Sequence, residues 1–403
     1  MIRDLRRGPL RGRNFRLLAT CNLISCAGSA VSSVAIPFAV LGIGGTAGDV
    51  GYVATAGLIP VIAFLLIGGV IADRLPRHQV MAAASTLEAL AQGASAVLVL
   101  TGQARVWQLA ALAAAGGAGL GLYFPAAQGL LPQTVEAGLR PQANALDRTV
   151  RNTASIGGAA LGGLLVGLAG PGWCLAIDAA SFAVAGALRT GMRFPGLPPA
   201  RAPGMLHDLR EGWHEFISRR WLWIIVAQFA IVVAVSAGTV SVLGPLVAHS
   251  HLGGARSWGF IVAAYGGGAV AGGLVMMRFR PRRILVAAML SVPAYSVLLF
   301  ALAVPLAVPL DVAAAGLAGG CLEVLSVSWA TTMQQEIPPG KLSRVASYDA
   351  LGNYALTPVG TAVAGPLASA FGTTAVLAAG GVLVVVLPVL VLLVPEVRHM
   401  RRA

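Results

Sequence analysis

The amino-acid sequence predicts an all-α membrane protein whose twelve transmembrane helices form two pseudo-symmetric six-helix halves. Three observations predict this fold class. The chain of 403 residues is 57% hydrophobic and 11% charged, with a mean hydropathy of +0.80, which leaves too little polar surface for a soluble globule of this length. Its apolar residues form long continuous runs, and related sequence patterns recur in the two halves of the chain.

The apolar runs are long enough to cross a membrane as helices, since a hydrocarbon layer about 30 Å thick requires about 20 helical residues. Backbone polar groups in lipid must be paired within the segment, and the runs do not alternate as barrel strands would, so helices are favoured. The predicted spans are residues 15–42, 50–72, 79–101, 106–131, 144–168, 173–192, 220–247, 257–277, 284–304, 308–331, 347–370 and 374–394.

The positively charged residues predict the orientation of these spans. With the N-terminus in the cytoplasm, 26 of the 28 Lys and Arg residues fall in cytoplasmic segments, and only Arg105 and Arg256 lie outside. Because cytoplasmic loops are enriched in such residues, we predict a multi-pass protein of the cell membrane with both termini cytoplasmic. The net charge of +13 then lies beside anionic lipid, which argues against a nucleic-acid partner.

The sequence carries no recognisable catalytic signature. Phosphate-loop, zinc-protease and nucleophile-elbow motifs are absent. The glycine-rich run 116–121 lies inside a predicted span with no strand before it, so close helix packing explains it better than a dinucleotide site. Four cysteines fall within spans without metal-ligand spacing, and we expect buried free thiols: Cys21, Cys26, Cys174 and Cys321. We therefore predict no enzymatic activity, cofactor or metal.

An internal repeat divides the chain. Residues 68–75 align with residues 272–279 at an offset of 204. Three further pairs share an offset of 202: Asp147 with Asp349, Gly158 with Gly360, and Gly163 with Gly365. A duplicated six-helix unit is the simplest explanation. It predicts an N-terminal half at residues 1–192, a cytoplasmic connection at 193–219 and a C-terminal half at 220–403.

The charged turn at residues 69–78 carries a family resemblance. Its sequence, GVIADRLPRH, resembles the signature loop of the major facilitator superfamily, G-x-L-A-D-R-x-G-R-[KR], with Pro76 and His78 as departures. Other stretches resemble the drug/proton antiporter branch that includes the enterobactin exporter and the macrolide efflux pumps: residues 14–18, 25–29, 36–37, 123–127, 131–132, 144–146 and 177–182. The resemblance implies a secondary transporter that works by alternating access.

The fifth predicted span carries part of an antiporter pattern. Antiporters of the superfamily have G-P-x-x-G-G there, and this chain has Gly158, Gly162 and Gly163 without the proline. We predict that these glycines are structural and allow close helix contact, while a proline-induced bend is not expected. The pattern favours export over import.

The turn at 69–78 is predicted to gate the cytoplasmic side. The span that begins near residue 347 presents unpaired N–H groups to that side, so Asp73 is positioned to cap it, a role that the resemblance also implies. Met277 stands in place of this acid in the second half, so the gate should be asymmetric. Arg74 and Arg77 are either partners of acidic groups or topology anchors. The predicted gating residues are Gly69, Asp73, Arg74, Arg77, Asp147, Arg148, Arg151 and Asp349.

Polar stripes on otherwise apolar helices indicate faces turned away from lipid. One stripe in the first span comprises Asn22, Ser25, Ser29, Ser32 and Ser33, and another in the fifth comprises Asn144, Arg148, Arg151 and Ser155. Hydrogen bonding between helices is as good an explanation as substrate contact for any one residue. The resemblance implies that spans 1, 4, 7 and 10 line a central cavity. The predicted cavity residues are Asn22, Ser25, Ser29, Tyr123, Gln228, Trp329, Tyr354 and Thr357.

Three acidic residues lie within predicted spans, where a charge costs several kcal/mol and indicates function. Glu323 is favoured for proton coupling because its span lines the cavity in the family. Glu88 is a second proton-coupling candidate, although a structural hydrogen bond competes evenly. Asp178 is predicted to fix helix packing. No basic residue is predicted deep in a span, since Arg148 and Arg151 lie near the cytoplasmic end. A cavity with an acid and no buried base suits neutral or cationic lipophilic substrates; an anionic substrate is less natural, although this arginine pair could receive one.

The function predicted from these observations is export of a small amphiphilic compound by proton antiport. The expected partners are a small-molecule substrate, protons and membrane lipids, and we expect a monomer. Two alternatives remain: an importer of a small solute, and a non-transporting membrane scaffold or sensor with the same fold.

Overall fold

A computed structural model describes residues 8–192, 194, 213–278, 281, 283–304, 307–337, 345, 348–349, 351–352 and 355–400. The chain packs as two compact units, Met1–Arg201 and Ala202–Ala403. In the described ranges the regular elements are all helices. Within these ranges, eleven helical spans, two of them made of consecutive α-helices, are long and apolar enough to cross a membrane. The protein is thus an all-α, multi-pass membrane protein.

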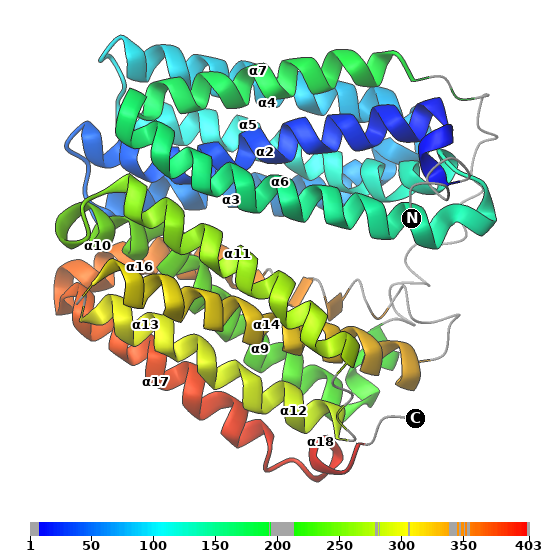
Figure 1. The fold of residues 1–403 in the computed structure, drawn as a ribbon, viewed down its shortest axis with the longest axis vertical. Coiled ribbons are helices and arrows are strands. Elements are labelled where there is room, and N and C mark those ends of the chain that lie inside the picture. Colours follow the sequence, from blue (N-terminus) through cyan, green and yellow to red (C-terminus); the bar gives the residue numbers. More distant parts are fainter. Residues whose placement is uncertain are drawn as a thin grey trace. The chain divides into compact units, whose positions relative to one another are not determined.

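Among its described residues, the first unit has six long helices (Figure 1). They are α2 (Arg13–Gly42), α3 (Ala47–Arg74), α4 (Arg77–Leu100), α5 (Val106–Leu130), α6 (Arg140–Ala169) and α7 (Pro171–Thr190). Short 3-10 turns precede α2 (η1, Pro9–Arg11) and join α5 to α6 (η2, Leu131–Gln133; η3, Ala137–Leu139). Within this unit α3 packs on α5, α2 on α6, and α4 on α7.

The second unit repeats this arrangement. Its helices are α9 (Arg220–Gly238), α10 (Gly244–His251), α11 (Ala255–Arg278), α12 (Ile284–Ser291), α13 (Tyr295–Ala303), α14 (Val308–Glu336), α16 (Thr357–Phe371), α17 (Thr373–Val391) and α18 (Pro395–His399). Here α11 packs on α14, α9 on α16, and α13 on α17, so the three pairings of the first unit recur in the same chain order.

Prolines explain where two spans depart from a single α-helix. The predicted span 220–247 is α9 and α10 joined by a π segment, η4 (Thr239–Leu243). The predicted span 284–304 is α12 and α13 joined by a 3-10 turn, η5 (Val292–Ala294). Pro245 and Pro293 lack the N–H that would continue the α-helical hydrogen bonds, so the backbone changes its pairing locally.

The helix ends follow from local chemistry. Thr46 and Asp49 form a capping box at the start of α3, with the Asp49 carboxylate accepting from the Thr46 backbone N–H at 2.8 Å. Gly170 between α6 and α7 and Gly372 between α16 and α17 both have a positive φ, which glycine adopts without steric cost. These two glycines are 202 residues apart, the offset of the sequence repeat.

The predicted spans agree closely with the helices. Most boundaries differ by four residues or fewer, and α14 continues five residues beyond the predicted end. The predicted span 347–370 corresponds to α16, which begins at Thr357, and several residues before it lie outside the described ranges. The predicted connection 193–219 also lies largely outside them.

Glycines set the closest helix contacts in both units. A Cβ at Gly117 of α5 would collide with the backbone oxygen of Gly57 on α3, and a Cβ at Gly268 of α11 would collide with that of Gly316 on α14. The run 116–121 therefore serves helix packing. In α6, Gly158 and Gly162 approach the backbone of α2 in the same way, and Gly163 is buried beside them.

Candidate functional site

A cavity of about 400 Å³ lies within the first unit. Five helices contribute to its wall: α2, α4, α5, α6 and α7. Its lining residues are Ser25, Cys26, Ser29, Ala30, Ser33, Glu88, Leu120, Tyr123, Phe124, Arg151, Asn152, Ser155 and Phe182. Hydroxyl groups and two charges thus face the same space as three aromatic rings, which is the mixed chemistry of a small-molecule site.

Glu88 is the one acidic residue of this lining. Its side chain comes from the middle of α4, and the residue is only 6% exposed. No hydrogen bond or ion pair joins its carboxyl group to any part of the chain that the structure describes. The structural hydrogen bond considered from the sequence is therefore not observed, and the carboxyl group is left to the cavity.

Arg151 is the one basic residue of the lining, and Asp147 holds it in place. Its Nε donates to Asp147 Oδ2 at 2.8 Å, four residues earlier on α6. Its Nη2 donates to the Tyr123 hydroxyl at 3.4 Å. Asn22 donates to the other Asp147 oxygen at 2.6 Å and accepts from Tyr123 at 2.9 Å. Asp147 therefore joins α2 to α6.

A second arginine completes this network and corrects the sequence interpretation. Arg189 of α7 is 0% exposed, although the sequence places it among the cytoplasmic anchors. It donates to Ser85 of α4, and at 3.4 Å to both Asn22 and Tyr123, with its guanidinium 5.0 Å from the centre of the Tyr123 ring. Arg189 lies in the last turn of α7 and so is not deep in the span, but it is a buried base beside the cavity, which the sequence interpretation did not expect.

Asp178 forms a separate buried network in the middle of α7, about three turns before Arg189. Gln92 of α4 donates to Asp178 Oδ2 at 2.7 Å, and its amide nitrogen also lies 2.7 Å from the Ser32 hydroxyl of α2. The Ser181 hydroxyl donates to the Asp178 backbone oxygen at 2.7 Å. Asp178 thus lies where α2, α4 and α7 meet; its packing role stays a prediction.

The polar stripe of the first span divides between these environments. Ser25, Ser29 and Ser33 line the cavity, whereas Asn22 and Ser32 are hydrogen-bonded to other helices. In the fifth span, Arg151 and Ser155 line the cavity, but Asn144 hydrogen-bonds to the Arg140 carbonyl and Arg148 is exposed. Some residues of a polar stripe therefore line the cavity, and others hydrogen-bond to neighbouring helices.

The remaining predicted cavity residues belong to the second unit. Gln228 of α9 is 4% exposed, and Thr357 begins α16. Trp329 of α14 donates from its indole nitrogen to Asp349 at 3.1 Å. Tyr354 lies outside the described residues. None of these residues lines the cavity of the first unit.

The predicted gating residues are only partly described. Gly69, Asp73 and Arg74 lie in the last turns of α3, but nothing is described of the Asp73 and Arg74 side chains. Arg77 donates to the Gly129 carbonyl at 2.8 Å. The described partners of Asp147 are Asn22 and Arg151.

Glu323, the favoured proton-coupling candidate from the sequence, lies in the middle of α14 and is half-buried. It belongs to the second unit, close to Gly273 of α11. The two candidate carboxyl groups therefore occupy different units, and Glu88 is the one that lines the polar cavity.

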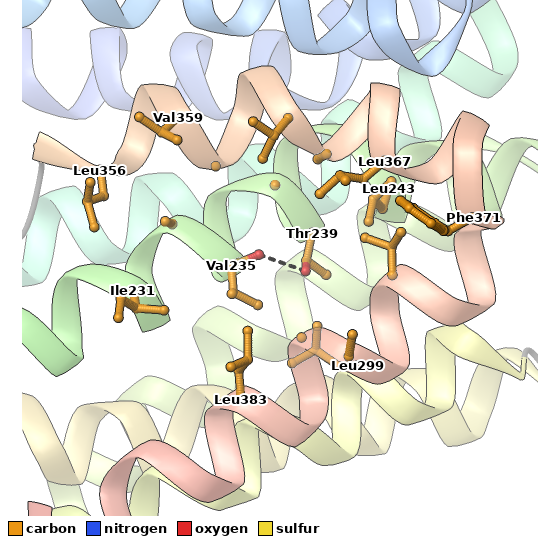
Figure 2. Close-up of a pocket in the computed structure, with 18 of the residues that line it drawn as sticks. Ile231, Val235, Thr239, Leu243, Leu299, Leu356, Val359, Leu367, Phe371 and Leu383 are labelled. Carbon is orange, nitrogen blue, oxygen red and sulfur yellow. Dashed lines mark hydrogen bonds between the residues drawn. The ribbon is translucent and has the colours of Figure 1, made fainter.

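The second unit contains an apolar groove of about 550 Å³. Figure 2 shows its side chains facing the space between α9, α16 and α17, among them Val235, Leu367 and Leu383. Thr239 supplies the one polar side chain of the lining, and its hydroxyl donates to the Val235 carbonyl at 2.8 Å (Figure 2). This groove offers a ligand no free polar partner.

Several residues of the first-unit site are missed by sequence reasoning. Arg189 follows an apolar run near a span end, where a buried arginine and a surface anchor look alike. Phe182, Phe124 and Leu120 resemble lipid-facing apolar residues. Asn152 and Cys26 adjoin residues of the predicted stripes, and this adjacency is the one signal that points to them.

Comparisons with known proteins agree with this architecture. The family described as "Transmembrane secretion effector" matches residues 6–402. The chain is 27% identical over 411 residues to the multidrug efflux pump Tap of Mycolicibacterium fortuitum, covering 98% of each chain. It is also 27% identical to Tap of Mycobacterium tuberculosis (strain ATCC 25618 / H37Rv), covering 99% of this chain and 96% of the relative.

Solved structures show the same fold at low sequence identity. The nucleoside transporter NupG aligns with a TM-score of 0.75 at 13% identity, covering 94% of this chain and 98% of its own. A bacterial homologue of the lysosomal transporter Spinster aligns with a TM-score of 0.68 at 16% identity, covering 94% and 95%. With the helix order, the signature turn and the family match over nearly its whole length, the chain belongs to the transmembrane secretion effector family of the major facilitator superfamily.

Proposed function

We propose that this protein exports small amphiphilic compounds in exchange for protons, by alternating access of its cavity. The multidrug efflux pumps to which it is 27% identical along nearly its whole length support export of drug-like compounds. A cavity of about 400 Å³ has the size of a small-molecule site, and its serines and aromatic rings suit a cargo with polar and apolar parts.

The observation that carries the proton coupling is the buried carboxyl group of Glu88 in that cavity, which has no hydrogen-bond partner among the described residues. An unpaired carboxylate in an apolar setting costs several kcal/mol, and a bound proton or cation removes that cost. A carboxyl group that must bind either a proton or a cargo cation can exchange one for the other on opposite sides of the membrane. Glu88 is therefore the first choice for the coupling group, with Glu323 as the second.

Three further parts of the proposal concern orientation, gating and organisation. Both termini face the cytoplasm, Asp73 closes the cytoplasmic gate, and the protein works as a monomer of two duplicated halves. Asp73→Asn should impair transport while the protein remains in the membrane. Unchanged transport rates in vesicles would contradict the gating role.

Transport can be tested with inverted membrane vesicles and a panel of fluorescent amphiphiles such as rhodamine 6G and ethidium. An exporter accumulates the dye when the vesicle interior is made acidic, and nigericin abolishes the accumulation by collapsing the pH gradient. Accumulation only in right-side-out vesicles would identify an importer. Absence of transport in either orientation across the panel would favour the scaffold.

The matched variants Glu88→Gln and Glu323→Gln assign the coupling group. Glu88→Gln should abolish gradient-driven accumulation while dye exchange without a gradient continues, because the amide keeps the shape but binds no proton. Glu323→Gln should keep most of the gradient-driven transport. The reverse result would transfer the coupling role to Glu323, and full coupling in both variants would contradict proton exchange at either carboxyl group.

A further inference from the structure

We infer that the cargo of the first-unit cavity is a zwitterionic amphiphile, whose cationic group contacts Glu88 and whose anionic group contacts Arg151. This inference rests on the proposed function and names its substrate class. It differs from the neutral or cationic cargo favoured from the sequence, because Arg151 lines the same cavity as Glu88.

The charges of the lining come from different helices. Glu88 is on α4 and Arg151 is on α6, and they are the one acid and the one base among the lining residues. No ion pair joins them in the described structure: Arg151 is paired with Asp147, whereas Glu88 has no hydrogen-bond partner among the described residues. The cavity therefore offers a ligand one group of each sign.

Glu88 satisfies the conditions for a ligand contact. The residue is only 6% exposed. It lines the cavity, and its carboxyl group has no hydrogen-bond partner among the described residues. A buried charge must be paired or neutralised. A primary or secondary ammonium group on the cargo supplies both opposite charge and N–H donors to the carboxylate oxygens.

Arg151 retains donors for an anion although it is already paired. Among the described residues, its oxygen partners are bound through Nε and Nη2. The guanidinium also hydrogen-bonds to the Cys26 sulfur, and because a guanidinium carries five N–H donors, at least two N–H groups remain for a carboxylate or similar oxyanion. The Asp147 contact at 2.8 Å holds the guanidinium in a fixed orientation, which reduces the entropy lost on binding.

Arg189 adds to the positive charge on this side of the cavity. Two guanidinium groups converge on the Tyr123 hydroxyl, and Asp147 is the one acid hydrogen-bonded to either of them within the described ranges. Arg189 therefore has no hydrogen-bonded carboxylate among the described residues, although its charge also acts on Glu88. The two guanidinium groups beside the Tyr123 hydroxyl favour an anionic group there and disfavour a second cation.

The rest of the wall accommodates the body of the cargo. Leu120, Phe124 and Phe182 present an apolar surface, while Ser25, Ser29 and Ser33 present hydroxyl groups along one helix. A compact aromatic body with a short dipolar head meets both surfaces.

Cys26 provides a binding readout that does not depend on transport. Its side chain lines the cavity, whereas Cys21 and Cys174 are fully buried. Cys321 is in the second unit and is half-buried, so Cys321→Ser leaves Cys26 as the accessible thiol. The rate of alkylation by N-ethylmaleimide then reports whether the cavity is occupied.

The probes are four derivatives of 2-naphthylalanine, which share one aromatic body. The free amino acid is a zwitterion, its amide is a cation, its N-acetyl derivative is an anion, and its N-acetyl amide is neutral. The zwitterion should protect Cys26 at a concentration at least about tenfold lower than the other three, since a tenfold ratio corresponds to a single modest contact. Equal protection by the cation or the anion, or no protection by any probe, would overturn the inference.

Variants separate the two contacts. Glu88→Gln should lower protection by the zwitterion to the level of the anion, while Glu88→Asp should keep part of the preference. The double variant Asp147→Asn/Arg151→Gln removes the guanidinium without leaving an unpaired carboxylate. It should lower protection by the zwitterion to the level of the cation. Arg140→Gln, an exposed charge on the same helix, is the control and should change nothing. If Arg140→Gln alone abolished the preference for the zwitterion, the assignment of Glu88 and Arg151 as the cargo contacts would be contradicted.

The outcomes for binding and transport are distinguishable. Charge-selective protection of Cys26 without transport of any probe would refute the proposed export function and leave the binding inference intact. Gradient-driven transport of the amide in preference to the amino acid would support export but overturn the zwitterionic cargo.

Discussion

The two units of this protein share a helix frame but enclose different chemistry. In the first unit, α3 packs on α5, α2 on α6 and α4 on α7, and the second unit repeats these pairings with α11 and α14, α9 and α16, and α13 and α17. The first unit encloses a cavity with a carboxyl group, a guanidinium group and hydroxyl groups. The second encloses a groove whose single hydroxyl is already bonded within its own helix.

Equivalent positions show how few residues create this difference. At the repeat offset of 202, Arg189 corresponds to Val391, and both are buried. Asp147 corresponds to Asp349, but Asp147 pairs with an arginine and Asp349 accepts from the Trp329 indole. Small residues and span lengths define the frame, whereas a few polar residues define the chemistry of each cavity.

The largest expected effect tests whether the frame is equivalent in the two units. Gly117→Ala and Gly268→Ala should each destabilise the fold by more than about 3 kcal/mol, because a methyl group would collide with a backbone oxygen that cannot move aside. Thermal unfolding in detergent, followed by circular dichroism, measures the effect.

The neighbouring glycines provide matched controls for this comparison. A Cβ at Gly116 makes only an ordinary contact, and a Cβ at Gly267 meets nothing within 4 Å. Gly116→Ala and Gly267→Ala should be neutral or slightly stabilising. If either Gly117→Ala or Gly268→Ala were tolerated like its control, the two frames would not be equivalent.

The next effect tests the polar network that distinguishes the first unit. Arg189→Gln should destabilise the protein by about 2–3 kcal/mol, because Ser85, Asn22 and Tyr123 lose a buried donor. Alkylation of the buried thiols Cys21 and Cys174 during heating reports unfolding of this unit. Val391→Ala in the second unit should cost less, since only packing is lost. An Arg189→Gln variant as stable as the parent protein would remove the network as a determinant of the first unit.

A smaller effect concerns the ion pair beside the cavity. A double-mutant cycle of Asp147→Asn and Arg151→Gln should give a coupling energy of about 1 kcal/mol, because the pair is partly exposed and therefore screened. Thermal unfolding of the four proteins supplies the cycle. Strict additivity would mean that the contact positions Arg151 without contributing to stability.

The smallest effect is expected in the apolar groove. Thr239→Val should change stability by less than about 0.5 kcal/mol and leave transport unchanged, because the hydroxyl serves only the Val235 carbonyl of its own helix. Unfolding and dye accumulation can be measured on one preparation. A strong transport defect would show that the two cavities are less different in function than in chemistry.

Local patterns in the sequence were sufficient for the fold and insufficient for the site. Spans such as 106–131 and 173–192 lie within two residues of α5 and α7, because hydrophobicity and turn residues act over short stretches of chain. Ser25, Ser29 and Tyr123 were predicted to line a central cavity from helical periodicity and the family resemblance; in the structure they line a cavity within the first unit. Periodicity could not separate them from Asn22 and Ser32, which face neighbouring helices.

By itself, the sequence determined that this chain spans a membrane, approximately where most of its spans lie, and which superfamily it resembles, since these properties depend on composition and short-range pattern. Only the tertiary structure decided that Arg189 is buried rather than a surface anchor, and that Glu88 and Arg151 line the same cavity. The physical reason is that the surroundings of a charge are set by the helices that pack around it, and those helices are far apart along the chain.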